Sequence, residues 1–196
     1  MSDLYERLEE LQDMTRILAA DVTRLGQRLG ERSIQAATTE EQDGVRRAYV
    51  RAVFALVEAV IQQHKRLLLD LLSRGLVAMQ PSVVGALSEQ AYVVDDNGTV
   101  TTRDQYLQLR RKLRAVYRSA GEALGTPLGV RYDDAGWRAF SEAVRLRDRI
   151  THPQTYEDCH ISGDDLDTVD LGHKWFRGVN DEFVRIAGLH RKHHHW

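Results

Sequence analysis

Apolar side chains recur at α-helical spacing over the first 30 residues, and this regularity is the strongest constraint on the fold. Positions 4, 8, 11, 15, 18, 22, 25 and 29 alternate steps of four and three residues, and seven of the eight are Leu or Val. This repeat predicts a long amphipathic helix within residues 1–30, with one apolar seam. Because few opposite charges flank the seam, we expect the helix to pack on its own domain or on a second subunit.

Further helical patterns follow along the chain. They cover about residues 40–73, 103–124, 133–152 and a last segment that begins after Ser162. These patterns predict an all-α, up-and-down bundle of four to five main helices, together with the long N-terminal helix. The predicted organisation is the helix at 1–30, a helical bundle at 40–190 and a disordered tail at 191–196.

One short insertion interrupts the helical pattern near residues 92–102. Two β-prone segments flank Asn97-Gly98, the dipeptide most typical of a two-residue β-hairpin turn. The nearby Asp95 and Asp96 resemble part of a calcium loop, but the remaining ligands of such a loop are missing. We therefore expect a small β-hairpin.

Composition and charge limit the classes of protein to consider. The chain has 196 residues with a net charge of −2, which argues against a protein that coats nucleic acid through bulk charge but leaves room for a small cationic cleft. Cys159 is the single cysteine, so an intrachain disulfide is impossible and a reducing compartment is expected. The start does not resemble a signal peptide, and the apolar stretches are too short to span a membrane. These features predict a soluble cytoplasmic protein without a membrane partner.

The segment Arg147-Asp148-Arg149-Ile150-Thr151-His152-Pro153 combines a guanidinium, a carboxylate and an imidazole at the end of a helical pattern. The spacing alone has little weight, because 23 Arg and 8 His in 196 residues produce Arg-x4-His by chance about once. It occurs twice, the second time at Arg185 and His190. The first match differs in its context, since an acidic residue follows the Arg and a proline ends the helix.

Residues 146–153 resemble the signature of HEPN domains, an all-α superfamily whose motif is Arg, a polar residue, three further residues and His. The segment from Arg51 to Glu58 also resembles an early-helix Arg/Glu pattern of many such proteins. The resemblance covers about residues 40–190. It implies a homodimer in which two Arg/His motifs share one cleft, and it implies no cofactor and no metal.

Two functions are consistent with this resemblance. The first is a metal-independent endoribonuclease, acting on RNA as a toxin or phage-defence effector, with an antitoxin or sensor protein as a further partner. The second is a non-catalytic module that binds a partner protein, a nucleotide or RNA.

The resemblance assigns catalytic roles to Arg147, Asp148 and His152 and substrate-binding roles to Glu58 and Arg51. A histidine can exchange protons with the ribose 2′-hydroxyl and the leaving 5′-oxygen near neutral pH, and an arginine can stabilise the phosphate charge. Asp148 lies one turn before His152, where it can orient the imidazole or hold Arg147. Five residues correspond to about 140° around a helix, so Arg147 and His152 converge poorly within one chain and a dimeric site is expected.

Simpler interpretations exist for these and other polar residues. His152 can be a helix C-cap, and Glu58 can form an internal salt bridge. The arginines and lysine between 110 and 118 form the strongest basic stripe in the chain, which is usually a solvated helix face and less often the wall of an RNA-binding groove. His160, Asp164 and His173 suggest a metal site, but their spacing matches no known ligand pattern and acids are favoured at a helix start anyway.

Overall fold

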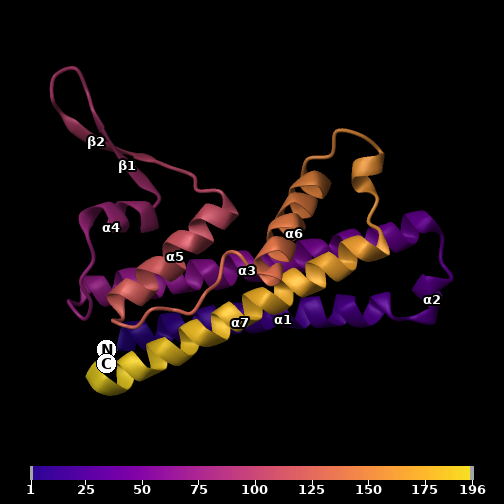
Figure 1. Ribbon diagram of the computed structural model, residues 1–196, viewed down its shortest axis with the longest axis horizontal. Coiled ribbons are helices and arrows are strands. Elements are labelled where there is room, and N and C mark those ends of the chain that lie inside the picture. The colour runs from indigo at the N-terminus through magenta and orange to yellow at the C-terminus, as the bar shows by residue number, and fades with distance from the viewer. Residues whose placement is uncertain (1, 195–196) are drawn as a thin grey trace. The chain divides into compact units, whose positions relative to one another are not determined.

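The computed structural model describes residues 2–194, with side chains described for residue 9 and for residues 12–190. The elements are α1 (Ser2–Leu29), α2 (Arg32–Gln35), α3 (Thr39–Ser73), α4 (Pro81–Leu87), β1 (Gln90–Val94), β2 (Val100–Asp104), α5 (Leu109–Ala123), α6 (Ala135–Thr151), η1 (Glu157–Cys159) and α7 (Gly163–His194) (Figure 1). The predicted class, a mostly helical fold with one inserted β-hairpin, is confirmed. Residues 195 and 196, which end the predicted tail at 191–196, lie outside the described residues.

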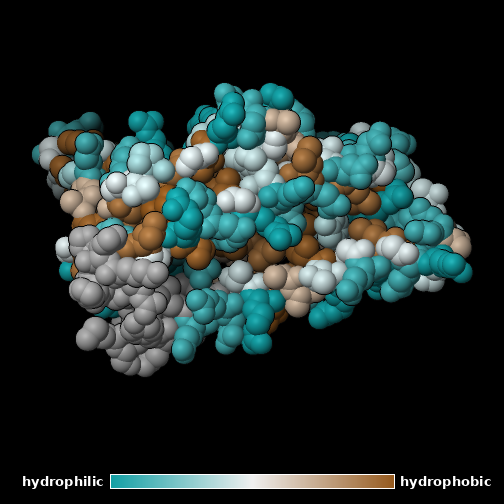
Figure 2. Space-filling model, turned by 60° about the horizontal axis from the view of Figure 1, so that its bottom comes forward, coloured by the Kyte–Doolittle hydropathy of each residue, from teal (hydrophilic) through white to brown (hydrophobic). Residues whose placement is uncertain are grey.

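The chain forms two compact units. Unit 1 comprises Met1–Val60 and Arg131–Gly178, and unit 2 comprises Ile61–Val130 and Val179–Trp196. The long helices α3 and α7 each contribute their first part to unit 1 and their second part to unit 2. On the face drawn in Figure 2, hydrophobic residues appear in patches within a largely hydrophilic surface.

In unit 1 the seam of α1 packs onto α3. The seam positions whose side chains are described (15, 18, 22, 25 and 29) are all buried or half-buried, with Val22 the most buried of them at 8% exposure. A Cβ atom on Gly26 would lie 3.6 Å from the ring of Tyr49 on α3. The described part of this seam, positions 15–29, is therefore buried or half-buried within the helix's own domain.

Local capping residues lie at the starts of α3, α6 and α7. The Thr38 hydroxyl and the Glu41 carboxylate form a reciprocal capping box at the start of α3. Asp134 accepts a hydrogen bond of 2.7 Å from the backbone N–H of Trp137 and so caps α6. Ser162 and Asp165 form a second reciprocal box at the start of α7. Each box satisfies N–H groups that a helix leaves without partners in its first turn.

The core of unit 1 is aromatic where α6 meets α7. Trp137 and Phe140 of α6 pack against Trp175 and Phe176 of α7, with ring centroids 5.3 Å apart for both Trp137–Trp175 and Phe140–Trp175. The two helices can approach closely because Gly172 has no side chain: a Cβ atom there would lie 2.8 Å from the Phe140 Cα. This contact sets the position of α6, and with it the position of the Arg147 segment.

Replacing Gly172 with alanine is therefore expected to destabilise the protein by about 1–3 kcal/mol, because the new methyl group would collide with the backbone of α6. Gly178 is the matched control, since it lies in the same helix and a Cβ atom there would meet nothing within 4 Å. Gly178→Ala should stabilise the helix by about 0.5–1 kcal/mol. Urea denaturation of both variants measures the difference. Equal stabilities would contradict the close approach of α6 and α7.

Unit 2 contains the hairpin, α4 and α5. Strands β1 and β2 pair antiparallel, from Gln90 with Asp104 to Val94 with Val100. Gly98 adopts a φ of 79° in the turn, which glycine tolerates without strain. The predicted hairpin is confirmed, and its strands extend two residues further from the turn than the predicted insertion.

The longer hairpin changes the start of the next helix. Residues 103 and 104 belong to β2, and α5 begins at Leu109 and not near 103. Tyr106 therefore lies in the connection before α5 and is 78% exposed, so the predicted start of this helix near residue 103 is wrong. The later start of α5 has a long-range cause. The Gln105 N–H donates to the Glu89 carbonyl at 2.7 Å, which extends the hairpin pairing and replaces a first helical turn.

Within residues 2–194, no helix has both the length and the hydropathy needed to cross a membrane.

Candidate functional site

The Arg147 segment forms the last turn of α6. The helix ends at Thr151, and His152 is its C-cap, with φ −127° and ψ 59°. Pro153 lacks an N–H group and disfavours the α-helical conformation for the residue before it, which explains the end of the helix at this position. The Thr151 hydroxyl donates to the Arg147 carbonyl, one turn earlier, at 2.7 Å.

Arg147 is held on three sides. Its Nη1 donates to the Asp148 Oδ1 at 2.8 Å, and its Nη2 forms an ion pair with Glu58 of α3. The guanidinium carbon lies 5.7 Å from the ring centroid of Phe54, also on α3. Only 19% of the Arg147 side chain is exposed, whereas Glu58 and Asp148 remain 47% and 55% exposed. The guanidinium therefore lies between the ring of Phe54 and two carboxylates that face solvent.

Arg51 supports the same end of α6 from one side. Its guanidinium donates to the backbone carbonyl of Ile150 at 3.0 Å, so it satisfies a C-terminal carbonyl of the helix. Arg51 and Glu58 are seven residues apart on α3, which places them two turns apart on one helix face. Four of the five predicted site residues thus lie in one cluster, composed of Arg51, Glu58, Arg147 and Asp148.

The fifth residue, His152, is exposed, and only its backbone is hydrogen-bonded. Its N–H donates to the Asp148 carbonyl at 3.0 Å, and its carbonyl accepts from the Gln154 side chain at 3.3 Å. Among the residues whose side chains are described, none forms a hydrogen bond or ion pair with the His152 imidazole. Of the two roles suggested for Asp148, its carboxylate takes the second, because it holds Arg147.

The formal charges of this cluster cancel. Arg51 and Arg147 carry two positive charges, and Glu58 and Asp148 carry two negative charges. A guanidinium has five N–H donors, and the two carboxylates engage one on each terminal nitrogen of Arg147. A phosphate would bind the remaining donors and would meet repulsion from the neighbouring carboxylates. In one copy of the cluster, Glu58 and Asp148 thus fix the orientation of the Arg147 guanidinium and compensate its charge.

A second histidine site, which no local sequence pattern indicates, lies in the loop after α6. The His160 Nδ1 is 2.8 Å from the Oδ2 of Asp43, and the other oxygen of Asp43 accepts from the Ile161 N–H at 3.3 Å. Asp43 is buried at 6% exposure, whereas His160 is partly exposed. A carboxylate on Nδ1 orients the ring and leaves Nε2 for other partners.

Three arginines fix this loop through its backbone. Arg46 donates to the Ile161 carbonyl at 2.6 Å, Arg47 to the Cys159 carbonyl at 2.6 Å, and Arg149 to the His160 carbonyl at 2.9 Å. Asp43, Arg46 and Arg47 share one face of α3, but no local signal links them to residues more than 110 positions later. Only the tertiary structure identifies this loop anchor.

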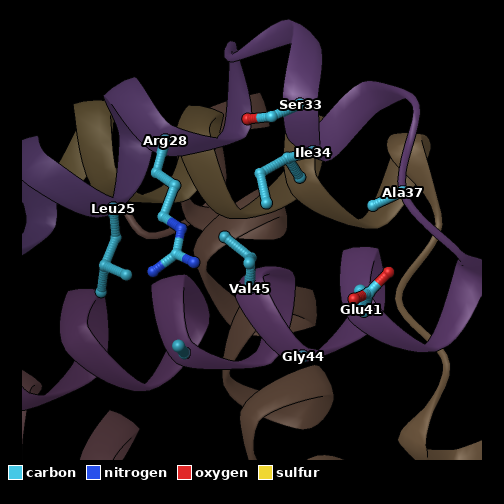
Figure 3. A pocket seen from close by; sticks show the side chains of 9 residues that line it. Leu25, Arg28, Ser33, Ile34, Ala37, Glu41, Gly44 and Val45 are labelled. Atoms are coloured by element: carbon cyan, nitrogen blue, oxygen red, sulfur yellow. The ribbon is translucent and has the colours of Figure 1, made fainter.

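A cavity of about 580 Å³ lies elsewhere in unit 1, between α1, α2 and the start of α3. Figure 3 shows Leu25, Ile34 and Val45 around it, with the Arg28 guanidinium beside them and Glu41 further along. Glu41 already caps α3, and its hydrogen bonds from Thr38 hold the pKa of its carboxyl below the ordinary value. None of the predicted site residues lines this cavity.

His160, Asp164 and His173 do not form a metal site. Among the residues whose side chains are described, no group of three or more His, Cys, Asp or Glu is arranged to hold a metal ion. Burial lowers the pKa of His173, and the nearby Arg177 acts in the same direction.

Comparison with known proteins adds no assignment: no protein-family model, no curated protein and no solved structure matches this chain.

Proposed function

We propose that this protein is a metal-independent endoribonuclease of the HEPN type, with Arg147 and His152 as its catalytic residues. The observation that carries the proposal is the ion pair between Arg147 and Glu58. These residues come from two helices, and each was selected from the sequence by a separate part of the HEPN resemblance. The two residues are 89 positions apart in the chain and yet in direct contact. A shared site requires such a contact, and two unrelated motif matches would rarely produce it.

The chemistry follows from the side chains. The imidazole of His152 removes the proton from a ribose 2′-hydroxyl, whose oxygen then attacks the adjacent phosphorus. The bond from phosphorus to the 5′-oxygen breaks, and the leaving oxygen takes a proton from a protonated imidazole. Arg147 stabilises the charge that develops on the phosphate. The products are a 2′,3′-cyclic phosphate and a free 5′-hydroxyl, and no metal ion takes part.

A second copy of the chain supplies what one copy lacks. His152 is at the end of α6 and has no side-chain partner among the described residues, while the charge of Arg147 is compensated by two carboxylates. In a homodimer with two facing motifs, the second Arg147 adds a second set of N–H donors for the phosphate, and the second His152 can act as the general acid.

Incubation of purified protein with a mixed-sequence RNA in excess EDTA tests this function. We expect cleavage to continue, with products that carry 2′,3′-cyclic phosphate and 5′-hydroxyl ends. An oligonucleotide with 2′-deoxyribose throughout is the matched control and should stay intact, because it lacks the nucleophile. Products with 5′-phosphate ends, or cleavage that stops in EDTA, would contradict the proposed chemistry.

One observation favours the alternative, a non-catalytic HEPN module that binds a partner protein, a nucleotide or RNA. The doubly paired Arg147 resembles a structural ion-pair centre, and removing one partner of such a centre destabilises a protein. Under this alternative, Arg147→Ala would lower the melting temperature, and the wild-type protein would leave RNA intact in the same assay.

A further inference from the structure

We propose that unit 2 carries a binding surface for single-stranded RNA, formed by Tyr106, Arg110, Arg111, Lys112 and Arg114. This surface, named here the α5 surface, is separate in sequence from the Arg147 cluster. The inference deepens the proposed function by naming the form of RNA that the protein holds, and it rests on RNA being the ligand. Binding can nevertheless be measured without cleavage.

The charge of this part of the chain is the first argument. Residues 103–118 contain six Arg or Lys and one Asp, a net charge of +5, whereas the whole chain has a net charge of −2. The remaining residues therefore sum to −7. A local positive region in an otherwise acidic protein attracts a polyanion to that region and not to the rest of the surface.

The geometry of α5 places Arg111 and Arg114 toward solvent. The helix buries Leu109, Leu113, Val116 and Tyr117 on one face. Arg111 and Arg114 are three residues apart and exposed on the opposite face, which makes them neighbours along the helix surface. Within the described side chains, no carboxylate forms an ion pair with Arg110 or Arg111. These two guanidinium groups are available to phosphate.

Lys112 leaves additional positive charge at the start of the helix. Its Nζ and that of Lys65 both bind the same oxygen of Glu89, at 3.0 and 2.7 Å. Burial opposes ionisation of Glu89, but the hydrogen bonds from the two lysines outweigh it and lower the pKa of its carboxyl. One negative charge is thus shared between two positive charges, and the cluster keeps a net charge of about +1.

Tyr106 adds an aromatic platform. It is 78% exposed, the highest exposure among the large hydrophobic residues described in unit 2. The Lys112 Nζ lies 5.5 Å from its ring centroid. Unpaired bases stack on exposed aromatic rings, while bases within a duplex are already stacked on each other. A ring beside cations therefore favours a single strand over a duplex.

The start of α5 supports the same conclusion. Its N-cap Gln108 makes no side-chain capping bond, and its first turn contains no acidic residue but contains Arg110 and Arg111. Cations are unfavourable near the positive end of the helix dipole. A bound phosphate would relieve this repulsion, so an anionic strand stabilises an arrangement that is costly without it.

Fluorescence anisotropy tests this surface with a labelled 12-nucleotide oligo(U) RNA. The His152→Ala protein is used for every measurement, so that cleavage does not complicate binding. Tyr106→Ala is expected to raise the Kd by about 5- to 100-fold, as for the loss of one stacked base, and Tyr106→Phe should restore it because the ring is retained. The combined Arg111→Gln and Arg114→Gln changes should reduce the slope of log K against log salt by about 1.4.

Arg74→Ala is the matched control, because Arg74 is an exposed cation of unit 2 outside the α5 surface. It should leave both the Kd and the salt slope unchanged. An unchanged Kd in Tyr106→Ala would overturn the inference, as would duplex RNA or polyglutamate binding as tightly as oligo(U). All substituted residues are exposed, and circular dichroism verifies the fold.

The two proposals fail separately. Cleavage by the wild-type protein without an effect of Tyr106→Ala on binding would reject the α5 surface alone. Tight, Tyr106-dependent binding without cleavage would reject the ribonuclease alone.

Discussion

Replacing His152 with alanine is expected to reduce RNA cleavage in EDTA by about 100- to 10,000-fold, because the substitution removes the proposed general acid and base. The fold should remain intact, since the His152 side chain is exposed and has no partner among the described residues. Its backbone hydrogen bonds do not depend on the imidazole. Single-turnover cleavage rates and thermal melts of the variant and the wild type measure the two effects.

The chain offers two matched controls for this experiment. His190 follows Arg185 at the same spacing, but Arg185 forms a bidentate salt bridge with Glu182, one turn earlier on α7, at 2.8 and 2.7 Å. His190→Ala should cleave at the wild-type rate. His160→Ala examines the histidine that Asp43 orients. If His160→Ala loses cleavage while His152→Ala retains it, the catalytic base is the Asp43–His160 pair and the assignment to His152 is wrong.

Unit 2 is expected to lose stability in mild acid because of His64. The ring of His64 stacks on Phe183 with centroids 3.7 Å apart, and its Nδ1 is 3.1 Å from the Tyr117 hydroxyl. Burial lowers the pKa of His64 to about 3, so the folded protein keeps this imidazole neutral. In the unfolded chain the same group has an ordinary pKa of about 6.5 and takes up a proton more readily.

The sign of the effect follows from linkage. Below about pH 6.5 the His64 imidazole takes up a proton in the unfolded state but stays neutral in the folded state. The free energy of unfolding therefore falls as the pH falls. At pH 4 the free energy of unfolding is lower by about 3 kcal/mol because of His64, and above pH 7 this decrease is negligible. Urea denaturation between pH 4 and 8 should show this slope.

A His64→Phe substitution should remove most of this pH dependence, because phenylalanine retains the stacking on Phe183 without a titratable group. Some dependence should persist, since burial and Arg177 also lower the pKa of His173. His152→Ala is the exposed control and should keep the wild-type slope. A slope that is unchanged in His64→Phe would show that His64 is not buried as a neutral ring.

Much of the secondary structure could be predicted because its determinants are local. Asp134 before α6 and Ser162 with Asp165 at the start of α7 bind N–H groups three residues away. Asn97-Gly98 likewise places the hairpin turn. The error at the start of α5 has the opposite origin, because Gln105 bonds to Glu89, 16 residues earlier, and this bond outweighs the helical pattern of residues 103–108.

The candidate site divides in the same way. Arg147, Asp148 and His152 can be selected from the sequence, because a helix and its proline stop arrange them locally. The contact of Glu58 with Arg147, the bond of Arg51 to Ile150 and the anchoring of His160 by Asp43 depend on how α3, α6 and the following loop pack. Helical periodicity and capping residues thus determine most of the helical segments, with the start of α5 as the exception. The tertiary structure decides which charges meet, because ion pairs between distant residues depend on packing that no local pattern encodes.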